Sequence, residues 1–163
     1  MKRARAAPLP PLALALSTLA ACAPPGAVSP ADVTFDTTAA WLRQGRDSTR
    51  LVVEVAASRA QHEVGLAGRT SLAPDVGMLF LFDLPRSADE GFWMWRTAVP
   101  LDIAFIDADG AILRVLGMDP CAAPSRDDCP GYFAEAPYAA ALEVGRGWFA
   151  RNGIGVGASV RVD

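Results

Sequence analysis

Apolar residues in this chain gather in short runs, which polar, glycine-containing or proline-containing segments separate. Several runs are rich in β-branched residues or apolar throughout, as is typical of strands that are covered on one or both faces. We expect strands at residues 33–35, 40–43, 51–56, 77–82, 91–95, 101–106, 111–116, 138–144 and 160–162. This pattern predicts a mainly β domain, a compact β-sandwich or barrel-like fold with one or two short helices.

Capping signals predict two short helices. Ser58 and Gln61 have the spacing of a capping box, which predicts a helix over residues 59–67. A second helix is expected over residues 148–152, with Gly153 as its left-handed C-terminal cap.

The first residues have the layout of an export signal. Lys2, Arg3 and Arg5 precede an apolar stretch that is too short to span a membrane and that ends at Cys22. Residues 19–22 resemble the bacterial lipobox, which implies cleavage before Cys22 and attachment of lipid to this cysteine. The alternative is an ordinary signal peptide in which the cysteine has no special role.

The lipoprotein interpretation divides the chain into three parts. Residues 1–21 are expected to be the signal peptide, residues 22–31 a lipidated tether and residues 32–163 the β domain. Two or more acyl chains hold a protein firmly on a bilayer. Ala23 after the cysteine resembles the sorting signal for the outer membrane of Gram-negative bacteria. We therefore expect a protein of the cell envelope that is anchored to the outer membrane and faces the periplasm.

Charge and cysteine content agree with export. Removal of the three N-terminal cations lowers the formal charge from −3 to −6, so we expect no nucleic-acid partner. Cys121 and Cys129 remain after Cys22 is assigned to lipid, and an oxidising compartment favours a disulfide between them. Such a bond would stabilise the domain by about 2–3 kcal/mol. With one histidine in the chain, we expect no metal site, and no cofactor motif is present.

From Leu51 onward the chain resembles the DUF192 family, also called UPF0127. The residues that carry the resemblance are Glu63, Val64, Gly65, Leu66, Arg69, Gly77–Phe80, Phe92, Trp93, Met94, Thr97, Pro100–Ile103 and Phe105–Asp107. The resemblance implies a compact, mainly β domain that is often secreted or lipid-anchored, and it implies no specific function. The family usually has Lys-Asn where this chain has Trp95 and Arg96, Met where it has Ala67, and Asp where it has Ala158.

The aromatic segment around Trp93 is the first candidate binding site. On a strand Trp93 and Trp95 would share one face and form a platform for a sugar ring or a partner protein, with Arg96 and Thr97 beside it. The alternative is that Trp93 belongs to the core and Trp95 covers its rim.

Asp102 is the second candidate, because it lies between apolar residues at a strand start, where ionisation has to be stabilised. Arg69, Arg96 and Arg114 are the expected cationic partners. Such a pair would either grip a ligand in a cleft beside Trp93 or hold the corner at Pro100 as a structural contact.

Other acidic residues are weaker candidates. Glu63 and His62 are adjacent on the predicted helix, where neighbours diverge, so a solvated helix face is the expected setting. Residues 107–110 resemble the start of a calcium loop, but a strand follows at once, so we expect a hairpin turn.

Three functions remain open from the sequence. The first is a non-enzymatic accessory lipoprotein that binds a small molecule, a glycan or a protein partner through Arg69, Trp93, Trp95, Arg96, Thr97 and Asp102. The second is a hydrolase of an envelope polymer that uses the carboxylates of Asp102 and Glu63 with Arg69 as an electrostatic helper. The third is a structural scaffold within a membrane complex.

Overall fold

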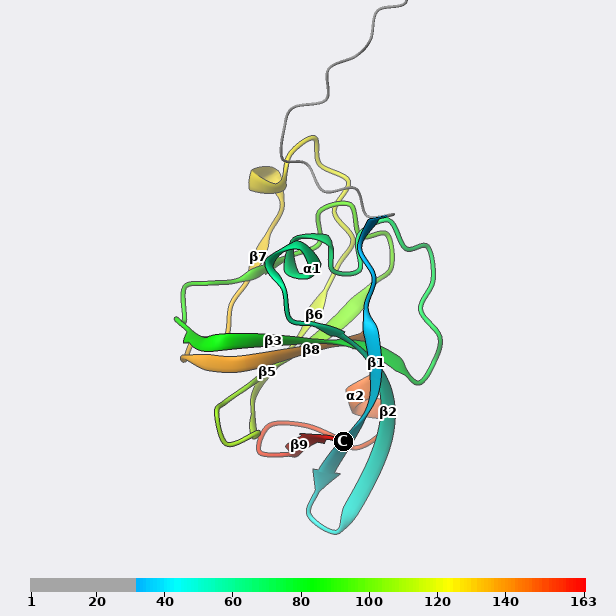
Figure 1. Cartoon of the computed structure of the whole chain (residues 1–163), viewed down its shortest axis with the longest axis vertical. Coiled ribbons are helices and arrows are strands. Elements are labelled where there is room, and N and C mark those ends of the chain that lie inside the picture. Colours follow the sequence, from blue (N-terminus) through cyan, green and yellow to red (C-terminus); the bar gives the residue numbers. More distant parts are fainter. Residues whose placement is uncertain (1–31) are drawn as a thin grey trace, which may run out of the picture.

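The computed structural model describes residues 32–163, and Figure 1 shows their arrangement. These residues form a mainly β, sandwich-like fold, as the sequence predicts, without a closed barrel. The strands are β1 (Asp36–Gln44), β2 (Asp47–Ala56), β3 (Val76–Arg86), β4 (Phe92–Trp93), β5 (Leu101–Ile106), β6 (Ile112–Met118), β7 (Gly131–Tyr132), β8 (Tyr138–Gly145) and β9 (Ser159–Val162). The helices are α1 (Arg59–Val64), α2 (Trp148–Arg151) and the 3-10 helix η2 (Arg126–Asp128).

Seven strands form one sheet in the order β6-β5-β8-β3-β2-β1-β9, and β4 pairs with β7 in a separate ribbon. Every neighbouring pair is antiparallel except β2 and β3. Their parallel pairing needs a crossover, which is the segment that contains α1. At the other end the start of β6 approaches β9 through a bridge between Ala111 and Ser159, and backbone hydrogen bonds join residues 110–112 to residues 157–160. The sheet therefore curls until its two edges meet along this short stretch.

Two hairpins follow the turn chemistry of the sequence. The first joins β1 and β2 at Gly45, whose φ is +61°. Residues 36–44 thus belong to the sheet, because β1 pairs with both β2 and β9. The second joins β5 and β6, where the Asp107 carboxylate accepts hydrogen bonds from the amides of Asp109 and Ala111. This local network confirms residues 107–110 as a turn.

The two faces of the sheet bury separate hydrophobic cores. α2 closes one core, whose largest members are Leu42, Leu51, Ile112, Trp148 and Phe149. The other core contains Met78, Phe80, Met94, Leu101, Ile103, Phe105 and Tyr138, and Leu66 from the segment after α1 contributes to it. Because both faces are covered, β5 is buried along its whole length. The continuous apolar runs in the sequence reflect this double burial.

The capping box at α1 is confirmed, but the helix is shorter than predicted. The Ser58 hydroxyl accepts from the Gln61 amide, and the Gln61 side chain accepts from the Ser58 amide. The helix ends at Val64, because Gly65 has a φ of +48° and its amide still donates to the Gln61 carbonyl at 2.8 Å. Positive φ is accessible to glycine at little cost, so Gly65 stops the helix before the expected end.

Two strand predictions were wrong, and the predictions for the N-terminal segment concern residues outside the described part of the chain. Residues 33–35 are not a strand, since β1 begins at Asp36, and the strand expected over residues 91–95 is limited to Phe92 and Trp93. The signal peptide, Cys22 and the tether fall in residues 1–31, so their assignments stay predictions. Within residues 32–163 no helix has the length and apolar character needed to cross a bilayer.

Gly77 allows β3 to lie close to β8. A Cβ atom on Gly77 would lie 2.6 Å from the Glu143 carbonyl oxygen and 3.0 Å from Val144 Cγ1, whereas one on Gly145 would meet nothing within 4 Å. We predict that Gly77→Ala lowers the free energy of unfolding by about 1–3 kcal/mol because of overpacking. Gly145→Ala is the matched control, and urea denaturation measures both. Equal stability of the two variants would contradict this packing argument.

Candidate functional site

A cavity of about 570 Å³ opens between the segment after α1 and the chain that leads into β1. Glu54 on β2 and Arg69 supply its charged groups, with their Oε2 and Nη2 atoms 2.5 Å apart. The remaining wall is formed by Val33, Thr34, Phe35, Val64, Gly65, Ala67 and Gly68. Both charged side chains are partly exposed, so the pair can meet a ligand from solvent. We call this region the Arg69 cavity.

The Arg69 cavity is linked to the segment that contains Trp95 and Arg96. The Gly68 amide donates to the Arg96 carbonyl at 2.8 Å, which fixes the two loops side by side. Arg96 has a φ of +60°, and its guanidinium carbon lies 4.1 Å from the centre of the Trp95 ring. A non-glycine residue at positive φ is strained, and such strain is concentrated at functional sites. The exposed Arg96 guanidinium is thus held on an aromatic support next to the cavity.

The two tryptophans do not form the shared strand face that the sequence predicted. β4 ends at Trp93, and Trp95 instead forms a bridge with Cys121 while its indole N–H donates to the Ala123 carbonyl at 3.2 Å. Trp93 is 41% exposed, and the guanidinium carbon of Arg126 lies 4.7 Å from the centre of its ring. Each indole ring therefore has an arginine over it.

The predicted disulfide between Cys121 and Cys129 is confirmed. It closes the loop that supplies both the Ala123 carbonyl beneath Trp95 and the Arg126 guanidinium over Trp93. The disulfide thus supports the aromatic segment directly, because Cys121 itself forms the bridge with Trp95. No group of three or more histidine, cysteine or acidic residues suited to a metal ion occurs within residues 32–163.

Thr97 is buried in the turn that presents Arg96. Its amide donates to the Met94 carbonyl at 3.0 Å, and Met94 is a fully buried member of the second core. The turn is thereby anchored between a core residue and a buried threonine. Thr97 positions the neighbouring arginine rather than presenting its own side chain to solvent.

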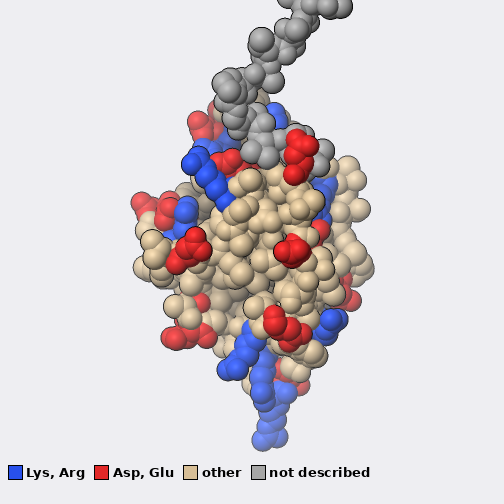
Figure 2. Space-filling view, in the orientation of Figure 1, with Lys and Arg blue, Asp and Glu red and all other residues tan. Residues whose placement is uncertain are grey.

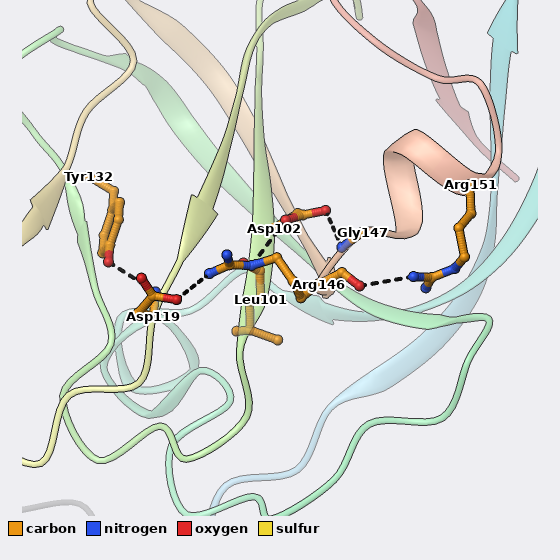
Figure 3. A network of polar contacts seen from close by, with 7 residues as sticks. All are labelled: Leu101, Asp102, Asp119, Tyr132, Arg146, Gly147 and Arg151. Carbon is orange, nitrogen blue, oxygen red and sulfur yellow. Dashed lines mark hydrogen bonds and ion pairs between the residues drawn. The ribbon is translucent and has the colours of Figure 1, made fainter.

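Asp102 lies in a different place from the tryptophans and pairs with a different arginine than expected. Figure 3 shows its carboxylate between Arg146 and Gly147. Oδ2 accepts from the Gly147 amide at 2.7 Å, at the start of α2, and Oδ1 lies 3.4 Å from Arg146 Nε. Alternation along β5 turns Asp102 toward the core closed by α2, opposite to the core that contains Met94. The expected partners Arg69, Arg96 and Arg114 are therefore replaced by Arg146.

The Arg146 side chain connects several elements in Figure 3. Its Nε donates to the Leu101 carbonyl at 3.0 Å, and its Nη2 lies 2.8 Å from Asp119 Oδ1. A Cβ on Gly117 would lie 3.0 Å from the Arg146 guanidinium, so glycine leaves room for this side chain to cross β6. Asp102 and Arg146 thus hold the corner between β5, β6, β8 and α2. This arrangement matches the structural alternative for Asp102.

Glu63 and His62 have different environments despite being neighbours. Glu63 is on the solvated face of α1, where its carboxylate pairs with Arg59 at 2.9 Å. His62 is partly buried, contrary to expectation, and its Nε2 lies 3.0 and 2.9 Å from the Ala56 and Leu81 carbonyl oxygens. Two acceptors at one ring nitrogen require that Nε2 carries the proton. Glu63 and Asp102 lie on different elements, and each pairs with an arginine of its own, Arg59 and Arg146 respectively.

Glu143 is a buried carboxyl group that our sequence reasoning missed. It lies on β8 between Met78 of β3 and Ile103 of β5, and it is only 5% exposed. Desolvation raises its pKa to about 8, and no residue among 32–163 donates a hydrogen bond to its carboxyl group. On the opposite side of β3, Glu54 of β2 pairs with the same Met78. The sequence signal that could have revealed Glu143 is a single acidic residue among apolar neighbours in the predicted strand over residues 138–144.

The raised pKa of Glu143 makes folding stability depend on pH. Between its ordinary pKa of 4.5 and about 8, the unfolded chain is ionised at this residue while the folded chain keeps the proton. The contribution of Glu143 is thus most favourable at low pH and is lost as pH rises through about 8. We predict that Glu143→Gln raises the melting temperature relative to wild type at about pH 9 and much less at about pH 5. Thermal denaturation at both values, with Glu63→Gln as the exposed control, measures this difference, and an identical shift at both would refute it.

Comparison with known proteins identifies relatives of the whole domain. The model of the family described as "Uncharacterized ACR, COG1430" (DUF192) matches residues 40–162. A crystal structure from Sinorhizobium meliloti 1021, provisionally described as a transcription regulator, has 30% identity and a TM-score of 0.69, covering 80% of this chain and 97% of that one. A protein of unknown function from Novosphingobium aromaticivorans DSM 12444 has 29% identity and a TM-score of 0.70, covering 83% and 91%. None of the curated proteins matches the chain. The sheet and the family match together show that the chain belongs to the DUF192 family.

Proposed function

We propose that this protein is a lipid-anchored protein of the bacterial cell envelope whose domain binds a small polar ligand in the Arg69 cavity without transforming it. The observation that carries this proposal is the open cavity with a partly exposed ion pair on its wall. Pockets that combine apolar lining with a few placed polar groups are typical ligand sites. The proposed anchor at Cys22 rests on the lipobox-like sequence.

The groups in the Arg69 cavity favour a ligand that has both an acidic group and hydroxyl groups. Arg69 uses one Nη atom toward Glu54, and a guanidinium has further N–H groups that can donate to a carboxylate or phosphate. Glu54 Oε2 is buried against Arg69, so the other carboxylate oxygen, Oε1, is the one that can accept a hydrogen bond from a ligand hydroxyl. An acidic sugar is the ligand class that satisfies both groups.

Trp95 and Arg96 extend the same site at its edge. The hydrogen bond between Gly68 and Arg96 holds the arginine next to the cavity wall. An exposed guanidinium supported by an indole ring offers both a charge and a flat surface to a sugar ring. We therefore propose a fragment of an envelope glycan that carries a carboxylate, such as a muropeptide fragment, as the ligand. In this proposal Asp102 and Thr97 do not contact the ligand, and they contribute only by stabilising the fold.

The binding proposal is tested by thermal shift and calorimetry with muropeptide fragments, N-acetylmuramic acid and N-acetylglucosamine. We predict saturable binding of the acidic sugars, and we predict that Arg69→Gln weakens it about tenfold or more because a charge-assisted hydrogen bond is lost. Arg59→Gln is the matched control, since the Arg59 side chain is 93% exposed on α1 and its ion pair is local. Binding that survives in Arg69→Gln, or absent binding by a folded wild type, would reject the proposed site.

The anchor is tested separately by intact-mass measurement of the protein recovered from the membrane fraction. We predict a chain that starts at Cys22 and carries the added mass of acyl chains, and we predict that Cys22→Ala abolishes both the processing and the added mass. Recovery of an unmodified chain that still begins at Met1 would refute the anchor and leave the ligand proposal standing.

A further inference from the structure

A second surface is formed by the outward side chains of β2, β1 and β9 at the end that carries the β1–β2 turn. We call it the Trp41 face and define it by Trp41, Arg43, Arg46, Arg50 and Arg161. Trp41 is 43% exposed, and the register places Arg50 of β2 and Arg161 of β9 directly opposite it on its two sides. Arg43 follows two residues later on the same face, and Arg46 lies in the turn. An indole is thus surrounded by exposed arginines.

The charge of the Trp41 face is opposite to that of the rest of the domain. Residues 32–163 contain twelve arginines and eighteen acidic residues. Six of these arginines form no ion pair with a described carboxylate, and four of the six belong to the Trp41 face. Asp47 is the acidic residue within the turn itself. Figure 2 shows the resulting concentration of blue at the lower end of the molecule.

We propose that the Trp41 face docks an acidic segment of another protein. Tryptophan and arginine are the side chains most enriched at the energetic centres of protein interfaces, and this face presents one tryptophan between arginines. The four arginines are not neutralised within the described chain, so their charge is free to complement carboxylates on a partner. The strands hold these side chains on a rigid sheet, which limits the entropy lost on docking.

The position of the Trp41 face favours a protein partner over the membrane. In Figure 1 the chain enters β1 at the end near α1, and the β1–β2 turn lies at the opposite end. Nine residues of strand separate the two, a length of about 30 Å. With the anchor proposed above, which this step requires, the face lies at the end of the domain opposite to the one where the tether joins it. An acidic protein in the aqueous compartment is the partner that can reach it.

The test measures binding of fluorescein-labelled poly-L-glutamate to the whole protein held in a neutral detergent. We expect saturable binding that weakens with added salt, about tenfold weaker binding by Trp41→Ala, and at least as large a loss by the double variant Arg50→Gln/Arg161→Gln. Arg59→Gln and Arg126→Gln lie outside the face and should leave the affinity unchanged. The acidic-sugar assay with Arg69→Gln reports on the other site, so the two proposed sites fail or succeed independently.

Four outcomes would overturn the proposal. The first is absent binding of poly-L-glutamate at low salt. The second is equal binding by wild type and Trp41→Ala, which would indicate unspecific charge attraction. The third is a preference of the wild type, lost in the double arginine variant, for phosphatidylglycerol vesicles or for polygalacturonate over poly-L-glutamate. The fourth is self-association in sedimentation velocity that the double variant abolishes, because the partner would then be a second copy of this chain.

Discussion

The parallel pairing of β2 with β3 is the constraint on which the proposed ligand site depends. Two parallel neighbours cannot be joined by a tight turn, so the chain crosses over one face of the sheet and carries α1 and Arg69 with it. The crossover ends beside the strand from which it started, and this return places Arg69 against Glu54. The capping box at Ser58 and the positive φ of Gly65 set the length of α1 and hence where the following loop begins. The cavity is a consequence of this connection.

Alternation across the sheet then separates the polar residues into different roles. Asp102 and Glu143 occupy adjacent strands, but they face opposite cores. The Asp102 carboxylate pairs with Arg146 and accepts a hydrogen bond from the Gly147 amide, and these contacts offset the cost of burying it. Glu143 has no such partner among the described residues, and burial raises its pKa to about 8. Two neighbouring strands thus carry two different acids: Asp102 is a structural anchor, and Glu143 is a buried carboxyl group whose protonation state changes with pH.

Local chemistry explains which features were predictable. The Ser58 cap, the turn at Asp107 and the pairing of Cys121 with Cys129 depend on residues close in sequence, and all three were found as expected. The partner of Asp102 was not found, because Arg146 is brought to it only by the pairing of β5 with β8. Trp95 was misplaced for a similar reason, since its bridge to Cys121 depends on the disulfide loop.

The exclusive use of arginine in residues 32–163 connects these sites. A guanidinium is planar and carries five donors, so it can stack on a ring and bind two acceptors at once, which an ammonium group does less well. Arg96 and Arg126 cover indole rings, and Arg146 contacts Leu101, Asp102 and Asp119 simultaneously. Lysine at these positions would keep the charge but lose the geometry. These arginines therefore connect separate parts of the fold, whereas the four on the Trp41 face pair with no described carboxylate and are clustered around one exposed indole.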